Sequence, residues 1–115
     1  MKKFLNRFRF AFCGIKSAFS EQTFRICCIF AALVIILMII LGLSIHDKEI
    51  LIITITIVLA FELLNSQIEK FLDIIQPDID NRVKAIKDIS AGAVLISIIG
   101  AIVIGILIFY PYIFR

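Results

Sequence analysis

Three long apolar stretches, separated by short polar segments, dominate the order of residues along the chain. Residues 26–45 and 89–114 contain no charged residue, and in the stretch between them, residues 50–68, Glu62 is the one charged residue. As helices, these stretches are long enough to cross a bilayer core of roughly 30 Å. The pattern therefore predicts an all-α integral membrane protein with three transmembrane helices, over about residues 23–44, 48–75 and 88–110.

The segment before the first apolar stretch has a different pattern. Aromatic and aliphatic residues recur there at helical spacing: Phe4, Phe8, Phe12, Ile15 and Phe19. Basic residues lie between them, and Arg7 and Arg9 interrupt what would otherwise resemble the apolar part of a signal peptide. We expect an amphipathic surface helix over about residues 3–20, lying among the lipid headgroups. The alternative is a charged tail that only sets orientation. The whole chain, 1–115, is expected to form a single domain.

Composition agrees with a membrane location. Hydrophobic residues make up 62% of the chain and the mean hydropathy is +1.10, whereas soluble proteins average about 45–50% apolar residues. The net charge is +3, but the basic residues lie beside the apolar stretches, where anionic lipid is the simpler partner. We therefore expect no nucleic-acid partner. The three cysteines have no metal-binding spacing, and we expect Cys27 and Cys28, at the start of the first span, to be packing residues.

The distribution of lysine and arginine predicts orientation. Six of the 12 basic residues precede residue 26, and four more lie between residues 70 and 87. The positive-inside rule places both regions in the cytoplasm and the 46–49 loop outside. The expected location is the bacterial inner or plasma membrane, multi-pass, with a cytoplasmic N-terminus. Within this layout, Pro77 should end the second helix, and Asp88 is a candidate cap for the third.

The cytoplasmic half of the second predicted span carries a stripe of polar residues. At about 100° per residue, four residues fall within an arc of about 80°: Glu62, Asn65, Glu69 and Asp73. A rise of 1.5 Å per residue separates Glu62 from Asp73 by about 16 Å along the axis. Glu62 would lie inside the hydrocarbon edge and Asp73 in the water layer.

A charged group inside a span costs at least about 2.5–3.5 kcal/mol at the bilayer centre, so these glutamates need a partner or a use. One interpretation is an ion pair with Arg25 or Lys87. The other is a site for a cation or a metal-bound phosphate, since hard oxygen ligands suit Mg²⁺. Glu21, just before the first span, supplies a second carboxylate at the same membrane surface, where it could share one metal ion with Glu69. Acidic and basic residues of the segment 78–88 converge there too, which favours a metal–phosphate substrate.

Two further observations limit the mechanism. Three spans are too few to enclose a polar stripe, which favours a homo-oligomer. The sequence contains neither of the glycine-rich phosphate loops, GxxxxGK[ST] or GxGxxG, so any nucleotide binds in some other way.

The stripe and its flanks resemble a known family. ELLNSQIEKFLD (62–73) is similar to the ELLNTAIE…D signature of the prokaryotic diacylglycerol kinase family, which includes undecaprenol kinases. KDISAGAVL (87–95) resembles the family's KD-xx-A-A-V-L segment, and SEQTFR (20–25), with Gly14 before it, resembles the segment that precedes its first span. The match runs through essentially the whole chain in order. Departures include Gln67, Cys27, Asp80 and Ile86, none of which removes an expected catalytic group.

The resemblance implies a homotrimeric membrane lipid kinase whose active sites are shared between subunits at the cytoplasmic surface. It would transfer the γ-phosphoryl group of Mg·ATP to a lipid hydroxyl, either that of diacylglycerol or that of undecaprenol. The resemblance makes Glu62 the general base, Asn65 the residue that orients the site, and Glu21 and Glu69 the Mg²⁺ ligands. It also implies ATP contacts at Glu21, Glu69, Asp78, Ile79, Asp80, Lys87 and Asp88, and lipid contacts at Glu62, Phe24, Arg25 and Ala91.

Two other classes of protein remain as alternatives. A small multidrug-type transporter also has few spans and an intramembrane glutamate, but it would be expected to have about four spans and a glutamate near mid-bilayer. A structural or assembly subunit would have no catalytic use for Glu62. Between the two lipids, the SAGAVL start of the third span and the LLN-x4-EK block lean weakly towards undecaprenol.

Overall fold

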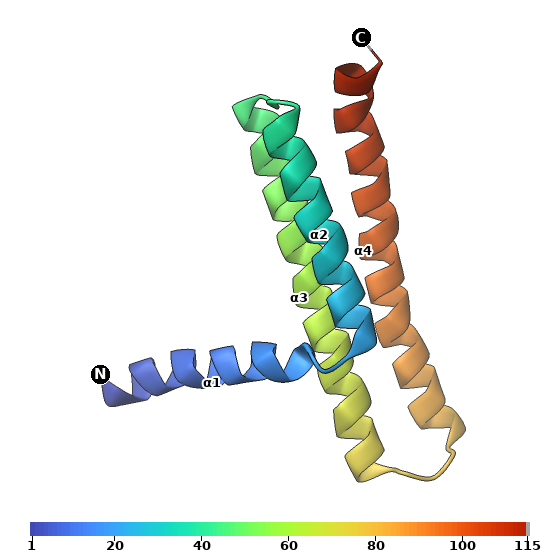
Figure 1. Cartoon of the computed structure of the whole chain (residues 1–115). Coiled ribbons are helices and arrows are strands. Elements are labelled where there is room, and N and C mark those ends of the chain that lie inside the picture. The colour runs from blue at the N-terminus through green and yellow to red at the C-terminus, as the bar shows by residue number, and fades with distance from the viewer. Residues whose placement is uncertain (115) are drawn as a thin grey trace.

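The computed structural model describes residues 1–114, which form four helices joined by short connections (Figure 1). They are α1 (Lys2–Ala18), α2 (Gln22–Ile40), α3 (Ile45–Ile75) and α4 (Asn81–Ile113). The last three are long and apolar enough to cross a membrane, with hydropathies of 2.8, 1.9 and 2.9. The predicted all-α fold, with three spans and an N-terminal helix, is confirmed.

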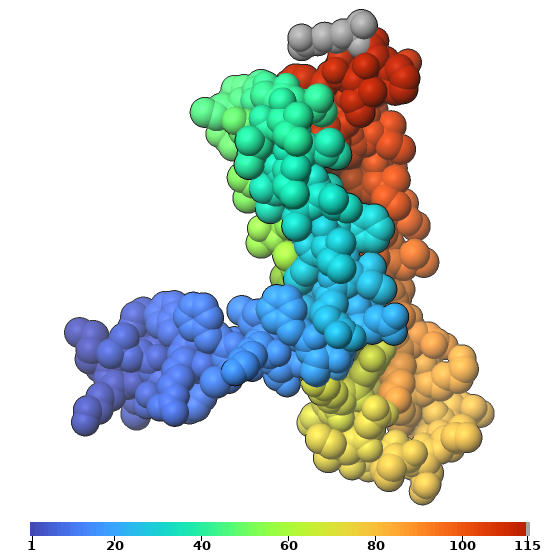
Figure 2. Space-filling model, viewed as in Figure 1, coloured from blue at the N-terminus to red at the C-terminus, as the bar shows by residue number. Residues whose placement is uncertain are grey.

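Helix α1 runs across the bundle instead of along it and projects away from the other helices (Figures 1 and 2). Its phenylalanines, including Phe4, Phe8 and Phe12, are exposed. Its inner end is fixed at the start of α2, where Phe24 is only 3% exposed and its ring stacks edge-on against Phe19 at 5.2 Å. A helix with exposed aromatic and basic residues, held transverse to three spans, has the geometry of an interfacial helix.

The turn between α2 and α3 is built around glycine and a helix cap. Gly42 has a φ of 60°, in the left-handed region that glycine adopts most readily. Ser44 caps α3 by accepting a hydrogen bond from the Asp47 N–H. Met38, Leu43 and Leu51 form a small buried cluster beneath this turn, and residues near the end of α4 pack against it. This cluster holds the α2–α3 turn against the end of α4.

The connection between α3 and α4 is short and polar. Helix α3 ends at Ile75, before Pro77, as predicted. Helix α4 begins earlier than predicted, at Asn81, because the Asp80 side chain caps it by accepting from the Arg82 N–H at 2.8 Å. The prediction that Asp88 caps the third span is therefore wrong, and Asp88 lies inside α4.

The faces of the three long helices are suited to lipid. Most of their large aliphatic and aromatic side chains are exposed, and three of the hydroxyls in these stretches bond to the backbone of their own helix. Thr54 and Thr56 donate to carbonyls four residues earlier, and Ser97 donates to the Val94 carbonyl. Because hydrocarbon offers no hydrogen-bond partner, this internal pairing is what a membrane requires.

Helix α3 packs mainly against α4 and less extensively against α2. An apolar groove of about 830 Å³ lies between the three helices and is lined almost entirely by aliphatic and aromatic side chains. The thinnest dimension of the chain is 20 Å, about two helix diameters. A single chain is thus a thin bundle with open faces.

Candidate active site

Polar side chains gather where α1 meets the bundle, on the second half of α3 and the start of α2. We call this group the carboxylate cluster; it comprises Glu21, Glu62, Asn65, Ser66, Glu69 and Lys70. At its centre, Glu62 is 2% exposed and makes no hydrogen bond or ion pair within residues 1–114. The charges that act on it most are those of two other carboxylates, Glu69 and Glu21. A buried carboxylate without a counter-charge is costly, so this position is better explained by chemistry than by stability.

Asn65 and Glu69 are joined one turn further along α3. The Asn65 Nδ2 donates to Glu69 Oε1 at 3.4 Å, as their shared position on the predicted polar stripe requires. Glu69 is partly buried and has no cationic partner among residues 1–114. One of its oxygens therefore faces Asn65.

Glu21 connects α2 to α3. It is the residue at the N-cap position of α2, and its Oε2 accepts a hydrogen bond of 2.7 Å from the Ser66 hydroxyl. Its Oε1 lies 3.2 Å from the Lys70 ammonium. The Ser66 hydrogen bond, and secondarily Lys70, lower the pKa of Glu21 below its ordinary value despite some desolvation. Glu21 is therefore a carboxylate at neutral pH.

The interpretation of Glu62 as half of a helix-joining ion pair is wrong. Lys87 pairs instead with Asp73 and so ties the end of α3 to the start of α4. Asp73, the outermost member of the stripe, therefore makes an ion pair between α3 and α4.

The other predicted nucleotide contacts lie apart from the carboxylate cluster in this chain. Asp80 pairs with Arg82 and Lys84 with Asp88. Arg82 lowers the pKa of Asp80. Asp78 is exposed and Ile79 is fully so, in the loop between α3 and α4. The α3–α4 loop and the start of α4 thus carry local ion pairs of their own.

The predicted lipid contacts do not form one surface in a single chain. Phe24 is buried at the base of α2, whereas Arg25 and Ala91 are exposed on α2 and α4. Phe24 therefore acts within one chain as a packing residue. Arg25 and Ala91 are free to face lipid or another copy of the chain.

Sequence reasoning missed three polar residues of this region. Ser66 lies four residues after Glu62 and so beside the same stripe, and Lys70 lies four residues after Ser66. Ser90 is buried on α4, and its placement depends on how α4 packs on α3, which no local pattern shows.

The donor set fits a magnesium ion that arrives with a nucleotide. Among residues 1–114, no three His, Cys, Asp or Glu side chains gather closely enough to hold a metal by themselves. Mg²⁺ is commonly held by one or two carboxylates together with substrate phosphates and water. The carboxylates of Glu21 and Glu69 are of the right kind for that arrangement.

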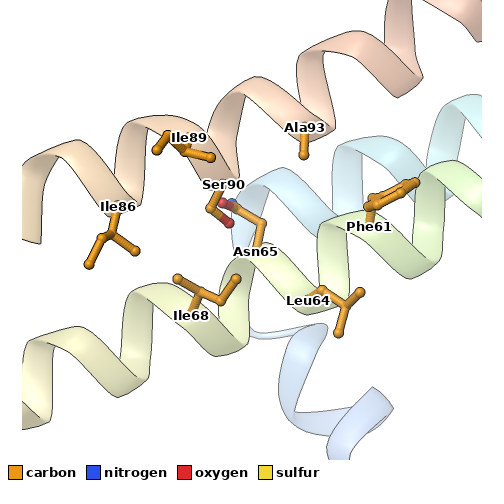
Figure 3. Close-up of a pocket in the computed structure, with 8 residues that line it drawn as sticks. All are labelled: Phe61, Leu64, Asn65, Ile68, Ile86, Ile89, Ser90 and Ala93. Atoms are coloured by element: carbon orange, nitrogen blue, oxygen red, sulfur yellow. The ribbon is translucent and has the colours of Figure 1, made fainter.

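A small pocket of about 310 Å³ opens between α3 and α4 beside the cluster (Figure 3). Six of its lining residues are apolar, and two are polar, Asn65 and Ser90. Asn65, from the polar stripe of α3, and Ser90, from α4, therefore line the same pocket.

Comparison with known proteins agrees with this arrangement. Residues 9–109 match the family described as prokaryotic diacylglycerol kinase. The chain belongs to that family. The prediction made from the sequence motifs is confirmed, as is the prediction of an enzyme of the lipid-kinase class.

Two relatives illustrate the range of the prokaryotic diacylglycerol kinase family. The chain is 34% identical over 112 residues to the undecaprenol kinase of Bacillus subtilis, and the match covers 96% of this chain and 91% of that protein. It is also 34% identical over 100 residues to a diacylglycerol kinase of Synechocystis, covering 85% of this chain. The chain spans 57% of the length of the Synechocystis protein. Family membership argues against both the transporter and the structural-subunit alternatives.

Proposed function

We propose that this protein transfers the γ-phosphoryl group of Mg·ATP to the hydroxyl of a membrane lipid. The observation that carries the proposal is Glu62, a buried carboxylate that has no counter-ion among residues 1–114 and lies near two further carboxylates, in a member of this family. In the reaction, the lipid oxygen forms a bond to the γ-phosphorus, and the bond from that phosphorus to the bridging oxygen breaks. ADP leaves, and the hydroxyl proton passes to Glu62.

Glu62 is proposed as the general base because it has no hydrogen-bond or ionic partner in residues 1–114 that would have to be displaced. It is also the deepest member of the polar stripe and thus the one nearest to a lipid hydroxyl. A base placed in this way contributes roughly 10²–10⁴-fold to the rate.

Glu69 and Glu21 are proposed to hold Mg²⁺ and through it the phosphates of ATP. When bound, the metal neutralises charge on the phosphate oxygens. Asn65 keeps Glu69 oriented, and Lys70 beside Glu21 adds positive charge at the edge of the site. Lys87, Asp88 and the loop residues 78–80 are the proposed contacts to the rest of the nucleotide.

We further propose that the chain works as a homotrimer with its N-terminus and α3–α4 loop in the cytoplasm. The expected ligand-contacting residues lie on different elements of a thin bundle: Arg25 on α2, Ala91 on α4 and residues 78–80 in the loop. This distribution supports a site that a neighbouring copy completes. The apolar groove between α2, α3 and α4 provides a face against which another copy can pack. The positive-inside rule supports the orientation.

Diacylglycerol and undecaprenol are the two candidate substrates, and the SAGAVL segment and the LLN-x4-EK block favour the second. The assay that tests the proposal offers γ-labelled ATP and each lipid separately to the purified protein. Labelled phosphatidic acid or labelled undecaprenyl phosphate identifies the substrate. No transfer to either lipid, from protein that is folded and supplied with Mg²⁺, would refute the proposed function.

A further inference from the structure

Of the two polar atoms of the Asn65 side chain, one makes a hydrogen bond and the other has no partner within residues 1–114. Its Nδ2 donates to Glu69. Because a carboxylate only accepts hydrogen bonds, the amide cannot be reversed, and Oδ1 must face away from Glu69. Oδ1 is buried and has no hydrogen-bond partner within residues 1–114. A buried acceptor in this state is rare in proteins, so it calls for a specific donor.

Ser90 is the side chain placed to supply that donor. It lies on α4, is 9% exposed, and with Glu62 and Ser66 makes up the buried polar residues of the described chain. Asn65 and Ser90 line the same pocket, and Figure 3 shows their side chains extending from α3 and α4 into the space between these two helices. The other six lining residues are aliphatic or aromatic or alanine, and none of their side chains can donate a hydrogen bond.

We propose that Ser90 is a positioning residue for phosphoryl transfer, whose hydroxyl donates to Asn65 Oδ1 when the site is loaded. A serine hydroxyl can turn about its own bond without moving the backbone. The resulting chain of hydrogen bonds, from Ser90 through Asn65 to Glu69, fixes a proposed metal ligand from a neighbouring helix. Such outer partners of metal ligands commonly affect metal affinity by 10–100-fold.

This placement also connects two parts of the site. Ser90 lies three residues after Lys87 on α4, and therefore on nearly the same helix face. A nucleotide that contacts Lys87 would act on α4 one turn from the residue that orients Glu69. The inference depends on the proposed function, because it takes Glu69 as a magnesium ligand.

Three variants test the proposal. Ser90→Ala removes the donor, and Ser90→Thr restores a hydroxyl, with the adjacent pocket available for the added methyl group. The matched control is Ser97→Ala, on the same helix, because the Ser97 hydroxyl bonds to the Val94 carbonyl of its own turn. The purified full-length protein in detergent is assayed for Mg²⁺-dependent binding of a non-hydrolysable ATP analogue by calorimetry, and for kcat and the KM of Mg·ATP.

Ser90→Ala should raise the Mg²⁺ concentration for half-maximal analogue binding by about tenfold, and the KM of Mg·ATP with it. For Ser90→Thr, both values should stay within about threefold of those of the wild type. For Ser97→Ala, both should equal those of the wild type. In an Asn65→Ala background, Ser90→Ala should have no further effect, because the group it positions is gone.

Two results would overturn the proposal. One is a Ser90→Ala protein whose Mg²⁺ concentration for half-maximal analogue binding is unchanged. The other is an equal increase of that concentration when Ser90→Ala is made in the wild type and in the Asn65→Ala background. A merely structural serine would lower the melting temperature without changing that concentration. Failure of the proposed function itself looks different, because the wild type would then phosphorylate neither lipid. The calorimetric comparison still decides the role of Ser90 in that case.

Discussion

The two ends of the bundle both carry polar side chains, but they use them in opposite ways. At one end, the Tyr112 hydroxyl accepts from the Ser44 N–H at 3.1 Å and donates to Asp47 at 2.8 Å. These three residues, which we call the Tyr112 clasp, tie α4 to the α2–α3 turn over a small apolar core. At the other end, the carboxylate cluster leaves Glu62 buried and unpaired within residues 1–114.

The difference separates stability from function. In the clasp each polar group has a partner of matching kind, as buried or partly buried groups in a stable structure normally do. In the carboxylate cluster three acidic groups share one region, with one lysine at its edge. The first arrangement stabilises a single chain, whereas the second needs a cation, a substrate or another subunit to balance its charge. Substitutions at the two ends should therefore have different consequences.

The largest effect should come from Glu62→Gln. The amide keeps the shape of the side chain but cannot accept the lipid proton, so kcat should fall by roughly 10²–10⁴-fold. Binding of Mg·ATP, measured by calorimetry with a non-hydrolysable analogue, should survive. The matched control is Glu49→Gln at the other end of α3, where the side chain is exposed near His46, and which should keep full activity.

A smaller effect is expected from Glu69→Gln. Loss of one proposed magnesium ligand should raise the KM of Mg·ATP and the Mg²⁺ requirement by about 10–100-fold, the range seen when a metal site is disturbed. Titration of activity with Mg²⁺ measures both. If Glu69→Gln left nucleotide binding intact while Glu62→Gln abolished it, the two assigned roles would have to be exchanged.

At the Tyr112 clasp, Tyr112→Phe should change stability and not catalysis. The substitution keeps the ring in its apolar surroundings and removes the hydroxyl that contacts Ser44 and Asp47. The expected loss is about 0.5–1.5 kcal/mol per hydrogen bond, seen as a lower melting temperature in detergent. A large fall in kcat with an unchanged melting temperature would contradict the separation of the two ends.

The smallest effect concerns pH. The pKa of Glu21 is lowered chiefly by the Ser66 hydrogen bond, so its contribution to stability is present above its ordinary pKa and disappears as the pH falls through the lowered value. Ser66→Ala should move this loss to higher pH. Melting temperatures measured from about pH 7 to about pH 3 should show the shift, because carboxylates titrate in that range. Identical pH profiles for the two proteins would argue against the Glu21–Ser66 contact.

Much of the fold could be predicted because membrane helices follow from the local order of apolar and charged residues. Uncharged stretches predicted α2 and α4, aromatic spacing predicted α1, and Pro77 predicted the end of α3. The start of α4 could not be predicted in the same way. Asp80 and Asp88 are both acceptable caps, and the choice depended on the backbone of the α3–α4 loop.

The candidate site was predicted in part for the same reason. Helical periodicity places Glu62, Asn65 and Glu69 on one stripe, and the structure joins the last two directly. The partners from other elements depend on helix packing. Ser66 and Lys70 contact Glu21 because α2 lies against α3. Ser90 lines the same pocket as Asn65 because α4 packs on α3. The nucleotide and lipid contacts predicted at Asp78, Arg25 and Ala91 stay predictions, since one chain does not bring them to the cluster.

The assignment of the carboxylate cluster as a lipid-kinase active site is tested most directly by transfer of labelled γ-phosphate from Mg·ATP to undecaprenol or diacylglycerol. The purified wild type and Glu62→Gln are assayed side by side. We predict a labelled lipid phosphate from the wild type and a loss of roughly 10²–10⁴-fold in the variant, with analogue binding retained. Equal transfer by the two proteins would contradict the assignment.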